Sequence, residues 1–230
     1  MLLALTLDLA LDALDVEVGR SELLMSVAPI RMMCVGGCVA VKILQVRSAT
    51  KDVNCLLDPN IDAALDYRNA LFAAIRSVAD ECGLMADWMN DDFKGFIKRP
   101  KRMGLFLRSV EQNIIVYAGT NVVLYAAALE WSLERKLRRI EAAGMRARAE
   151  DMSDALALVR VLKKNGPPLS VEYLSKLNYN GFESVLGWGI GRAKKEYERV
   201  YGEVGIADWV WDEKAKKHQY LGLDKKWYCV

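Results

Sequence analysis

The sequence predicts an α+β fold, in which a small mixed sheet is flanked by helices and followed by a helical lobe. Two observations carry this prediction. Residues 32–35 form an apolar run of the length of a buried strand, and residues 52–57 are expected to form a second strand. Longer segments, in which apolar residues recur at three- and four-residue steps, lie after these runs and are typical of amphipathic helices.

The first helix is expected over residues 2–15, because three acids recur there at helical spacing within an apolar segment. A signal peptide is the alternative, but the segment has no basic start and no cleavage signature. A short helix is expected over 21–26, capped by its serine and ended by Pro29. A long amphipathic helix is expected over 62–82, stopped by Gly83.

A glycine pair joins the first strand to a helix expected over 38–46. Glycines at Gly36 and Gly37 let the backbone approach a ligand, and the free N–H groups of a helix start can hold a phosphate. On the second strand, Asp52 and Asn54 are two residues apart, so their side chains leave the same face. Oxygen ligands beside a phosphate-binding turn suit Mg²⁺ and a nucleoside triphosphate.

The next segments are expected to complete the sheet. Asn90 can cap a short helix over 91–97, and contact with a nucleotide is the alternative role. Residues 99–102, Arg-Pro-Lys-Arg, are expected to form a solvated connector rather than a binding patch. The β-branched runs 113–117 and 122–125 predict a hairpin that closes the sheet, and neither run contains an acid.

From residue 127 onward the pattern is helical. The expected helices are 129–143, 148–162, a short one capped by Ser170, and 182–201. We therefore divide the chain into an α/β core with N-terminal helices (1–126), a helical lobe (127–204) and an aromatic, basic tail (205–230). The tail mixes tryptophan and tyrosine with lysine. We expect it to pack on the core, and binding of single-stranded nucleic acid is the alternative.

Composition excludes few functions. The formal net charge is +2, so charge neither requires nor excludes a nucleic-acid partner. Five cysteines without a framework, with Cys34, Cys38 and Cys55 inside apolar runs, predict buried thiols in a reducing compartment. A zinc site would lack ligands, since His218 is the single histidine. No apolar run reaches the roughly 18 residues needed to cross a bilayer, so we expect a cytoplasmic protein without a membrane partner.

The spacing of several of these residues resembles a known family. Gly36-Gly37 followed by Arg47-x-x-Thr50-x-Asp52-x-Asn54 is similar to the core of the nucleotidyltransferase superfamily. The chain is most like the branch of the abortive-infection toxin nucleotidyltransferases and their uncharacterised fungal relatives, over residues 30–165. Members pair the glycine turn with an Asp-x-Asp on the next strand, whereas this chain has an amide in place of the second acid.

The resemblance implies a nucleotidyltransferase-like sheet and a reaction. A nucleoside monophosphate would pass from a nucleoside triphosphate to an RNA, a protein or a small acceptor, with Mg²⁺ or Mn²⁺. The implied catalytic and metal-binding residues are Asp52 and Asn54. The implied nucleotide-binding residues are Gly36, Gly37, Arg47, Thr50, Lys51, Lys136 and Asp151.

Two alternatives stay open at this point. Lys136 would steady the triphosphate and Asp151 would orient it or the acceptor, but acids are favoured at a helix N-terminus whatever the function. A capped helix with surface ion pairs is therefore the other interpretation of this pair. Likewise, the neutral side chain of Asn54 leaves both an active transferase and a catalytically degenerate member, which would act as a nucleotide-binding or interaction module. A plain interaction protein, whose glycine turn is only structural, is a further interpretation.

Overall fold

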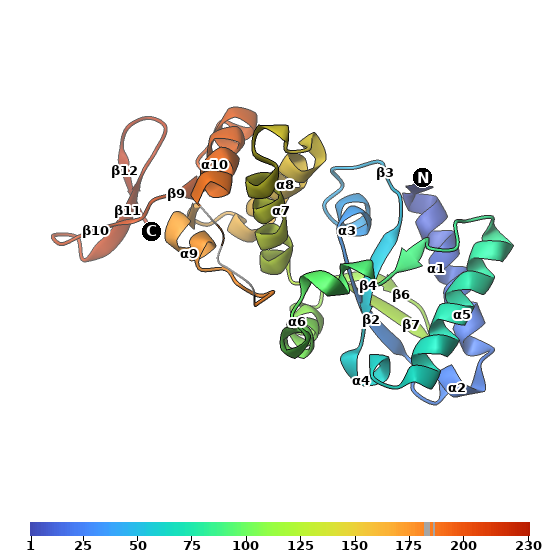
Figure 1. Cartoon of the computed structure of the whole chain (residues 1–230). Helices are drawn as coiled ribbons and strands as arrows, with labels where there is room; N and C mark the ends of the chain where they lie inside the picture. The colour runs from blue at the N-terminus through green and yellow to red at the C-terminus, as the bar shows by residue number, and fades with distance from the viewer. Residues whose placement is uncertain (182–184, 186) are drawn as a thin grey trace. The chain divides into compact units, whose positions relative to one another are not determined.

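The computed structural model describes residues 1–181, 185 and 187–230, and it confirms an α+β fold with a mixed sheet flanked by helices (Figure 1). The chain divides into two compact units, Met1–Ala128 and Leu129–Val230. The first unit holds a five-stranded mixed sheet, and the second is mainly helical and ends in a small antiparallel sheet. No helix that the structure describes has the length and apolar character needed to cross a bilayer.

The sheet of the first unit has its earliest strand at the centre. From edge to edge its strands are β5 (Met89–Asn90), β4 (Val53–Leu57), β2 (Ile30–Val35), β7 (Val122–Ala126) and β6 (Ile115–Ala118). β2 runs antiparallel to β4 and parallel to β7, while β4 and β5 are parallel and β6 and β7 antiparallel. The two buried strands and the hairpin predicted from the apolar runs are thus confirmed.

Helices surround this sheet. They are α1 (Ala4–Gly19), α2 (Glu22–Met25), α3 (Gly37–Lys42), α4 (Pro59–Asp62), α5 (Leu65–Cys82), α6 (Arg99–Gln112) and the 3₁₀ helix η1 (Asp92–Phe96). The first helix begins two residues later than expected, because β1 (Leu2–Leu3) pairs with β3 (Ala49–Thr50). Ser21 caps α2 as predicted, since its hydroxyl accepts a hydrogen bond from the N–H of Leu24 at 3.3 Å.

Three predicted boundaries are wrong. The helix expected over 62–82 begins only at Leu65, as α5, because the Asp58 carboxylate and Pro59 begin a separate short helix, α4, just before it. The connector expected at 99–102 is the first turn of α6, where the missing N–H of proline is not needed for a helical hydrogen bond. Asn90 does accept from the N–H of Asp92, but it belongs to β5 and the helix that follows is 3₁₀.

One face of the sheet is buried against α1 and α5 (Figure 1). Leu7, Leu11 and Leu14 of α1 are fully buried there. α1 is also tied to the hairpin by Asp15, whose carboxylate accepts hydrogen bonds from the backbone N–H groups of Asn121 and Val122, both at 2.7 Å. This carboxylate is satisfied by the backbone and is therefore a structural group.

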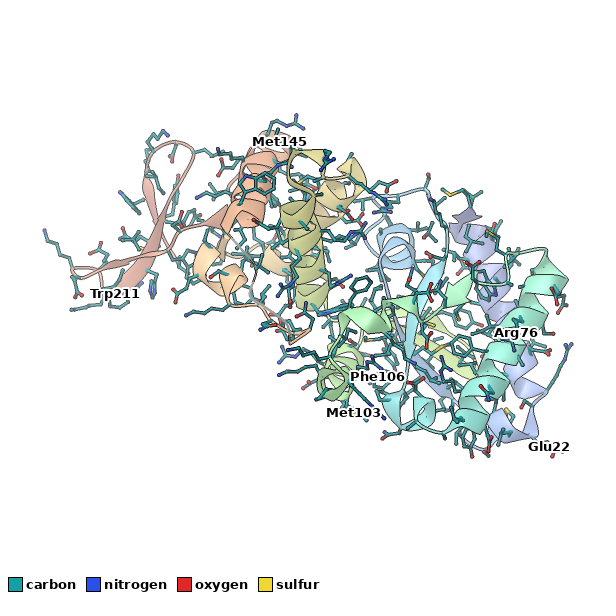
Figure 2. The ribbon with its side chains drawn as sticks, viewed as in Figure 1. Glu22, Arg76, Met103, Phe106, Met145 and Trp211 are labelled. Carbon is teal, nitrogen blue, oxygen red and sulfur yellow. The ribbon has the colours of Figure 1, made fainter. Side chains whose placement is uncertain are left out.

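The other face of the sheet is covered in part by α6, which carries Phe106 (Figure 2). Met33 is fully buried beneath this helix, and the hydroxyl of Ser109 lies 3.3 Å from its sulfur. Nearer the end of β2, the side chains of Val35 and Asn54 are only half-buried. The side chain of Asn54 in β4 therefore lies on the less covered part of this face.

The second unit contains α7 (Leu129–Ala143), α8 (Ala149–Lys163), α9 (Val171–Ser175), α10 (Gly187–Tyr201) and the 3₁₀ helix η2 (Gly144–Arg146). β8 (Leu169–Ser170) and β9 (Ile206–Ala207) are parallel. The helices predicted over 129–143 and 148–162 are confirmed, and the hydroxyl of Ser170 caps α9. The start of the last helix was predicted at 182, and residues 182–184 and 186 lie outside the described residues.

The C-terminal sheet consists of β10 (Val210–Asp212), β11 (Lys217–Leu221) and β12 (Trp227–Cys229), paired antiparallel in that order. The expected packing of this tail on the α/β core stays a prediction. The strands pair with one another, and large aromatic side chains such as Trp211 and Trp227 stay exposed. The physical reason is the alternating pattern of the segment, which two short turns fold into a meander of its own.

Candidate functional site

The glycine turn, Gly36-Gly37, lies where β2 ends and α3 begins. Gly36 has φ 70° and ψ −129°, a conformation that favours glycine. A Cβ atom at Gly37 would overlap the hydroxyl of Thr50 and would lie 2.7 Å from its Cβ. Position 37 therefore has no room for a side chain, because β3 packs directly against the turn.

Strand pairing brings Asn54 of β4 to this turn, and Asp52 directly precedes the strand. Asn54 is paired with Val35, the residue just before the glycines, and on its other side with Asn90 of β5. The hydroxyl of Thr50 donates a hydrogen bond to the backbone carbonyl of Asp52 at 3.0 Å. Asp52 thus lies between two residues that both adjoin the glycine turn, and the structure brings these predicted residues together at one end of the sheet.

The side chains of Asp52 and Asn54 are half-buried. Within the part of the chain that the structure describes, neither the carboxylate of Asp52 nor the amide of Asn54 makes a hydrogen bond or an ion pair. Asp15 differs, since its carboxylate is saturated by backbone N–H groups. Polar groups without internal partners at a partly covered position are those that a ligand can use.

The remaining predicted nucleotide-binding residues of the first unit are Lys51 and Arg47. Lys51 is exposed beside Asp52, and Arg47 is half-buried in the segment that joins α3 to β3. α3 has only six residues and ends at Lys42, so it is shorter than the helix expected over 38–46. Its N–H groups and dipole would therefore contribute little to an anion site at the turn.

Oxygen atoms at this end of the sheet suit one cation. They are the carboxylate of Asp52 and the amide oxygen of Asn54. Mg²⁺ keeps several waters and is usually held by one or two carboxylates plus substrate phosphates, so these donors fit a single hydrated ion. They do not fit a pair of ions that share bridging carboxylates, because no group of three His, Cys, Asp or Glu side chains with suitable geometry occurs among the described residues.

The second predicted pair lies in the second unit and is engaged internally. The ammonium of Lys136 donates to Asp151 at 2.9 Å and lies 2.7 Å from a carboxylate oxygen of Asp154. Arg139 also pairs with Asp151, at 3.1 Å. Lys136, Asp151 and Asp154 are all buried between α7 and α8. This geometry is that of the ion-pair interpretation, although buried rather than at the surface as expected.

A third charged cluster was not predicted. Arg68 lies 3.2 Å from Asp62 and 3.1 Å from Asp91, and Lys94 lies 2.6 Å from each of the same two acids. Burial raises the pKa of Asp91, but hydrogen bonds from Lys94 and Arg68 outweigh it, so the pKa lies below its ordinary value. Only the i,i+3 spacing of Asp91 and Lys94 signals this cluster in the sequence.

The three cysteines of the apolar runs are buried free thiols, as predicted. Cys34 and Cys55 are directly paired across β2 and β4. Burial raises the pKa of Cys34 well above its ordinary value and that of Cys55 to about 12. Such thiols stay protonated and unreactive at neutral pH, so they pack as small apolar side chains.

Comparison with known proteins does not identify this site. No family model matches the chain, and no curated protein and no solved structure matches it either. What the site does must therefore be inferred from its own residues and from the resemblance of its motif.

Proposed function

We propose that the first unit is nucleotidyltransferase-like. It binds a nucleoside triphosphate at the glycine turn and transfers the nucleoside monophosphate to an RNA, a protein or a small acceptor, with Mg²⁺ or Mn²⁺. The observation that supports this most is the meeting of the glycine turn with Thr50, Asp52 and Asn54 at one end of a mixed sheet. The spacing of the motif in the sequence adds to it.

Each residue has a role that follows from its position. The glycine turn lets phosphate oxygens approach the backbone, since no Cβ atom intervenes. Lys51 places an exposed positive charge beside the phosphates. Asp52 holds the cation together with the amide oxygen of Asn54. The cation, when bound, neutralises charge on the reacting phosphate. We assign no nucleotide contact to Lys136 or Asp151, because they are buried in a closed ion-pair cluster.

The second candidate function is nucleotide binding without transfer. The observation that favours it is the single carboxylate at the site. An amide at position 54 supplies no negative charge, and loss of one comparable electrostatic group costs about 3–4 kcal/mol of transition-state stabilisation. Asp58 does not replace it, because its buried carboxylate pairs with Arg31 at 2.7 Å and caps α4.

Binding is tested by thermal shift of the full chain with each nucleoside triphosphate and Mg²⁺ or Mn²⁺. A ligand at one hundred times its dissociation constant adds about 2.7 kcal/mol of stability, which is a measurable rise in melting temperature. Asp52→Ala should abolish this rise. Asp80→Ala, which removes an exposed acid of α5, is the matched control and should keep it. If no triphosphate shifts the melting temperature with either cation, the proposal is wrong.

Transfer is tested with labelled triphosphates and total RNA or protein as acceptor. Labelling by the natural chain that Asp52→Ala abolishes identifies an active transferase. Binding without labelling, with labelling created by Asn54→Asp, identifies the degenerate form. These two results separate the candidate functions, since the substitution at position 54 restores the charge that the amide lacks.

A further inference from the structure

Aromatic side chains line one face of the C-terminal sheet. Trp211 is paired with His218, and Tyr220 with Tyr228, so within each pair the side chains leave the same side. His218 and Tyr220 are two residues apart on β11, which joins the pairs into one row. Trp209 precedes Trp211 by two residues and continues the row. We call this row the aromatic face: Trp209, Trp211, His218, Tyr220 and Tyr228.

The rings of the aromatic face are close together and reach solvent. The ring centroids of Trp211 and His218 are 5.1 Å apart, those of Trp209 and His218 are 6.0 Å apart, and Tyr220 and Tyr228 stack at 5.7 Å. The exposed fractions are 37% for Trp209, 46% for Trp211 and 44% for Tyr228. Figure 2 labels Trp211 on this sheet. A continuous row of exposed rings is a binding surface rather than a core.

Several rings are held in place. Trp209 donates its indole N–H to the carbonyl of Pro168 at 3.1 Å. Tyr228 donates its hydroxyl to Asp224 at 2.9 Å, and its ring lies so close to Gly222 that a Cβ there would be 2.5 Å away. Such fixed rings lose little conformational entropy when a flat ligand stacks on them.

A pocket of about 350 Å³ opens beside the two stacked tyrosines. Tyr220 and Tyr228 line one part of it, and Lys163, Gly166, residues 202–204 and residues 222–224 line the rest. A pocket of this size accepts a flat, single-ring or double-ring group beside the tyrosines. The aromatic face is therefore continuous with a space that a ligand can enter.

The charges around the sheet leave a positive excess. Its acids are engaged: Glu213 pairs with Lys216 at 2.9 Å, and Asp212 accepts hydrogen bonds from Gln219 and from the turn. The ammonium groups of three exposed lysines have no acidic partner within the described part of the chain. These lysines are Lys214, Lys217 and Lys225. Unpaired cations at the rim of an aromatic surface favour a ligand with negative charges.

Two lysines lie in the turns of the sheet at positions whose backbone conformation would be less strained for glycine. Lys216 has φ 53° and Lys225 has φ 64°, and both lie in the turns that connect the three strands. Glycine or asparagine adopts this left-handed conformation at lower cost. Both turns thus carry a positively charged residue at a position where backbone geometry disfavours it.

We propose that the aromatic face binds single-stranded nucleic acid without sequence preference. Bases stack on the rings, and Lys214 and Lys225, in the two turns at the rim of the sheet, contact phosphates. Stacking suits any base because every base has a π-face, and the flexible single strand can follow the row. The unpaired lysines favour this polyanion over an apolar peptide. This inference concerns the second unit and does not depend on the function proposed for the first.

The test measures fluorescence anisotropy of labelled oligothymidylate or oligouridylate of about 15 nucleotides with the full chain. Binding should weaken as salt rises, as expected when phosphates release counterions. Trp211→Ala should lower affinity about tenfold, and Trp211→Phe should retain most of it. Lys214→Ala with Lys225→Ala should make the logarithmic dependence on salt shallower by about one unit.

The matched control is Trp227→Ala, which removes an exposed ring from the opposite face of the same sheet. It should change affinity less than about twofold. Circular dichroism of each variant establishes that the sheet still forms. The proposal fails if the oligonucleotide does not bind at low salt, if a duplex of equal length binds as well, or if Trp227→Ala weakens binding as much as Trp211→Ala. Concentration-dependent dimerisation that Trp211→Ala abolishes, without oligonucleotide binding, would instead assign this face to a second copy of the chain.

Discussion

The two predicted nucleotide-binding constellations, one in each unit, use their charges in opposite ways. In the first unit, Asp52 and Asn54 are half-buried and without internal partners. In the second unit, Lys136 is buried and held by both Asp151 and Asp154. Both constellations had the residue types of a nucleotide site in the sequence. Only the first leaves its polar atoms available to a ligand.

The difference teaches that residue type and spacing do not separate a site from a structural cluster. The burial of the side chains and the presence of internal partners separate them. A buried charge is tolerated when an opposite charge and hydrogen bonds compensate for lost hydration, and removing one partner is then costly. A half-buried acid without a partner adds little to stability, so its cost of removal is small. Substitutions in the two units should therefore differ in stability and in ligand binding.

The largest effect is expected from Lys136→Met. This change leaves the buried carboxylates of Asp151 and Asp154 without their shared ammonium, and we expect a loss of about 3–5 kcal/mol in unfolding free energy. Urea denaturation measures it. Lys195→Met, on the exposed side of α10, is the control and should stay within about 0.5 kcal/mol. Equally small losses of unfolding free energy for both variants would contradict the burial of this ion-pair cluster.

A smaller loss is expected from Gly37→Ala. The added methyl group overlaps Thr50, so β3 or the turn must shift, at a cost of about 1–3 kcal/mol. Gly104→Ala is the control, because a Cβ at that helical position meets no atom within 4 Å. It should be neutral or stabilising by about 0.5–1 kcal/mol. If both variants unfold at the same urea concentration, the turn does not pack against β3 as described.

Acid should weaken the cluster of Arg68, Lys94, Asp62 and Asp91. The pKa of Asp91 is raised by burial and lowered more strongly by its two cationic partners, and so lies below that of the unfolded chain, about 3.9. The stability that it adds is complete above that value and is lost as pH falls through the folded pKa. Urea midpoints measured across this range should decline less steeply with acid for Asp91→Asn. An unchanged decline would show that the cluster does not hold this carboxylate ionised.

The smallest change in stability is expected from Asp52→Ala, less than about 0.5 kcal/mol. The carboxylate has no described partner to lose. The same variant should nevertheless lose the thermal shift produced by a triphosphate and Mg²⁺. A loss of unfolding free energy similar to that of Lys136→Met would contradict this difference between the two units, since Asp52 would then be a structural residue.

Local patterns predicted the parts of the fold that depend on local interactions. The strands β2 and β4, the helices α7 and α8, and the caps Ser21 and Ser170 follow from hydrophobic period and side-chain hydrogen bonds a few residues away. α6 was misplaced at its start because a proline among basic residues is typical of loops as well as of first helical turns.

Of the candidate site, the position of Asn54 next to the glycine turn was predictable from the two strands, whereas the shared face of Asp52 and Asn54 stays a prediction, because β4 begins only at Val53. The contact of Thr50 with Gly37 was not predictable, since it depends on β3 folding back on the turn. The partners of Lys94 and Lys136 were likewise beyond prediction, because burial of an ion pair is set by how distant helices pack. Nor does the pattern of the C-terminal residues say that their strands pair only with one another.

The parallel pairing of β2 with β7 has a consequence for synthesis of the chain. The central strand emerges early from the ribosome, but one of its edges waits for the last strand of its unit. An open strand edge can recruit foreign strands, so the nascent first unit is vulnerable to aggregation during that interval. Translation of residues 129–230 then lasts on the order of ten seconds at about 5–20 residues per second. Closure of this sheet therefore overlaps in time with synthesis of the second unit.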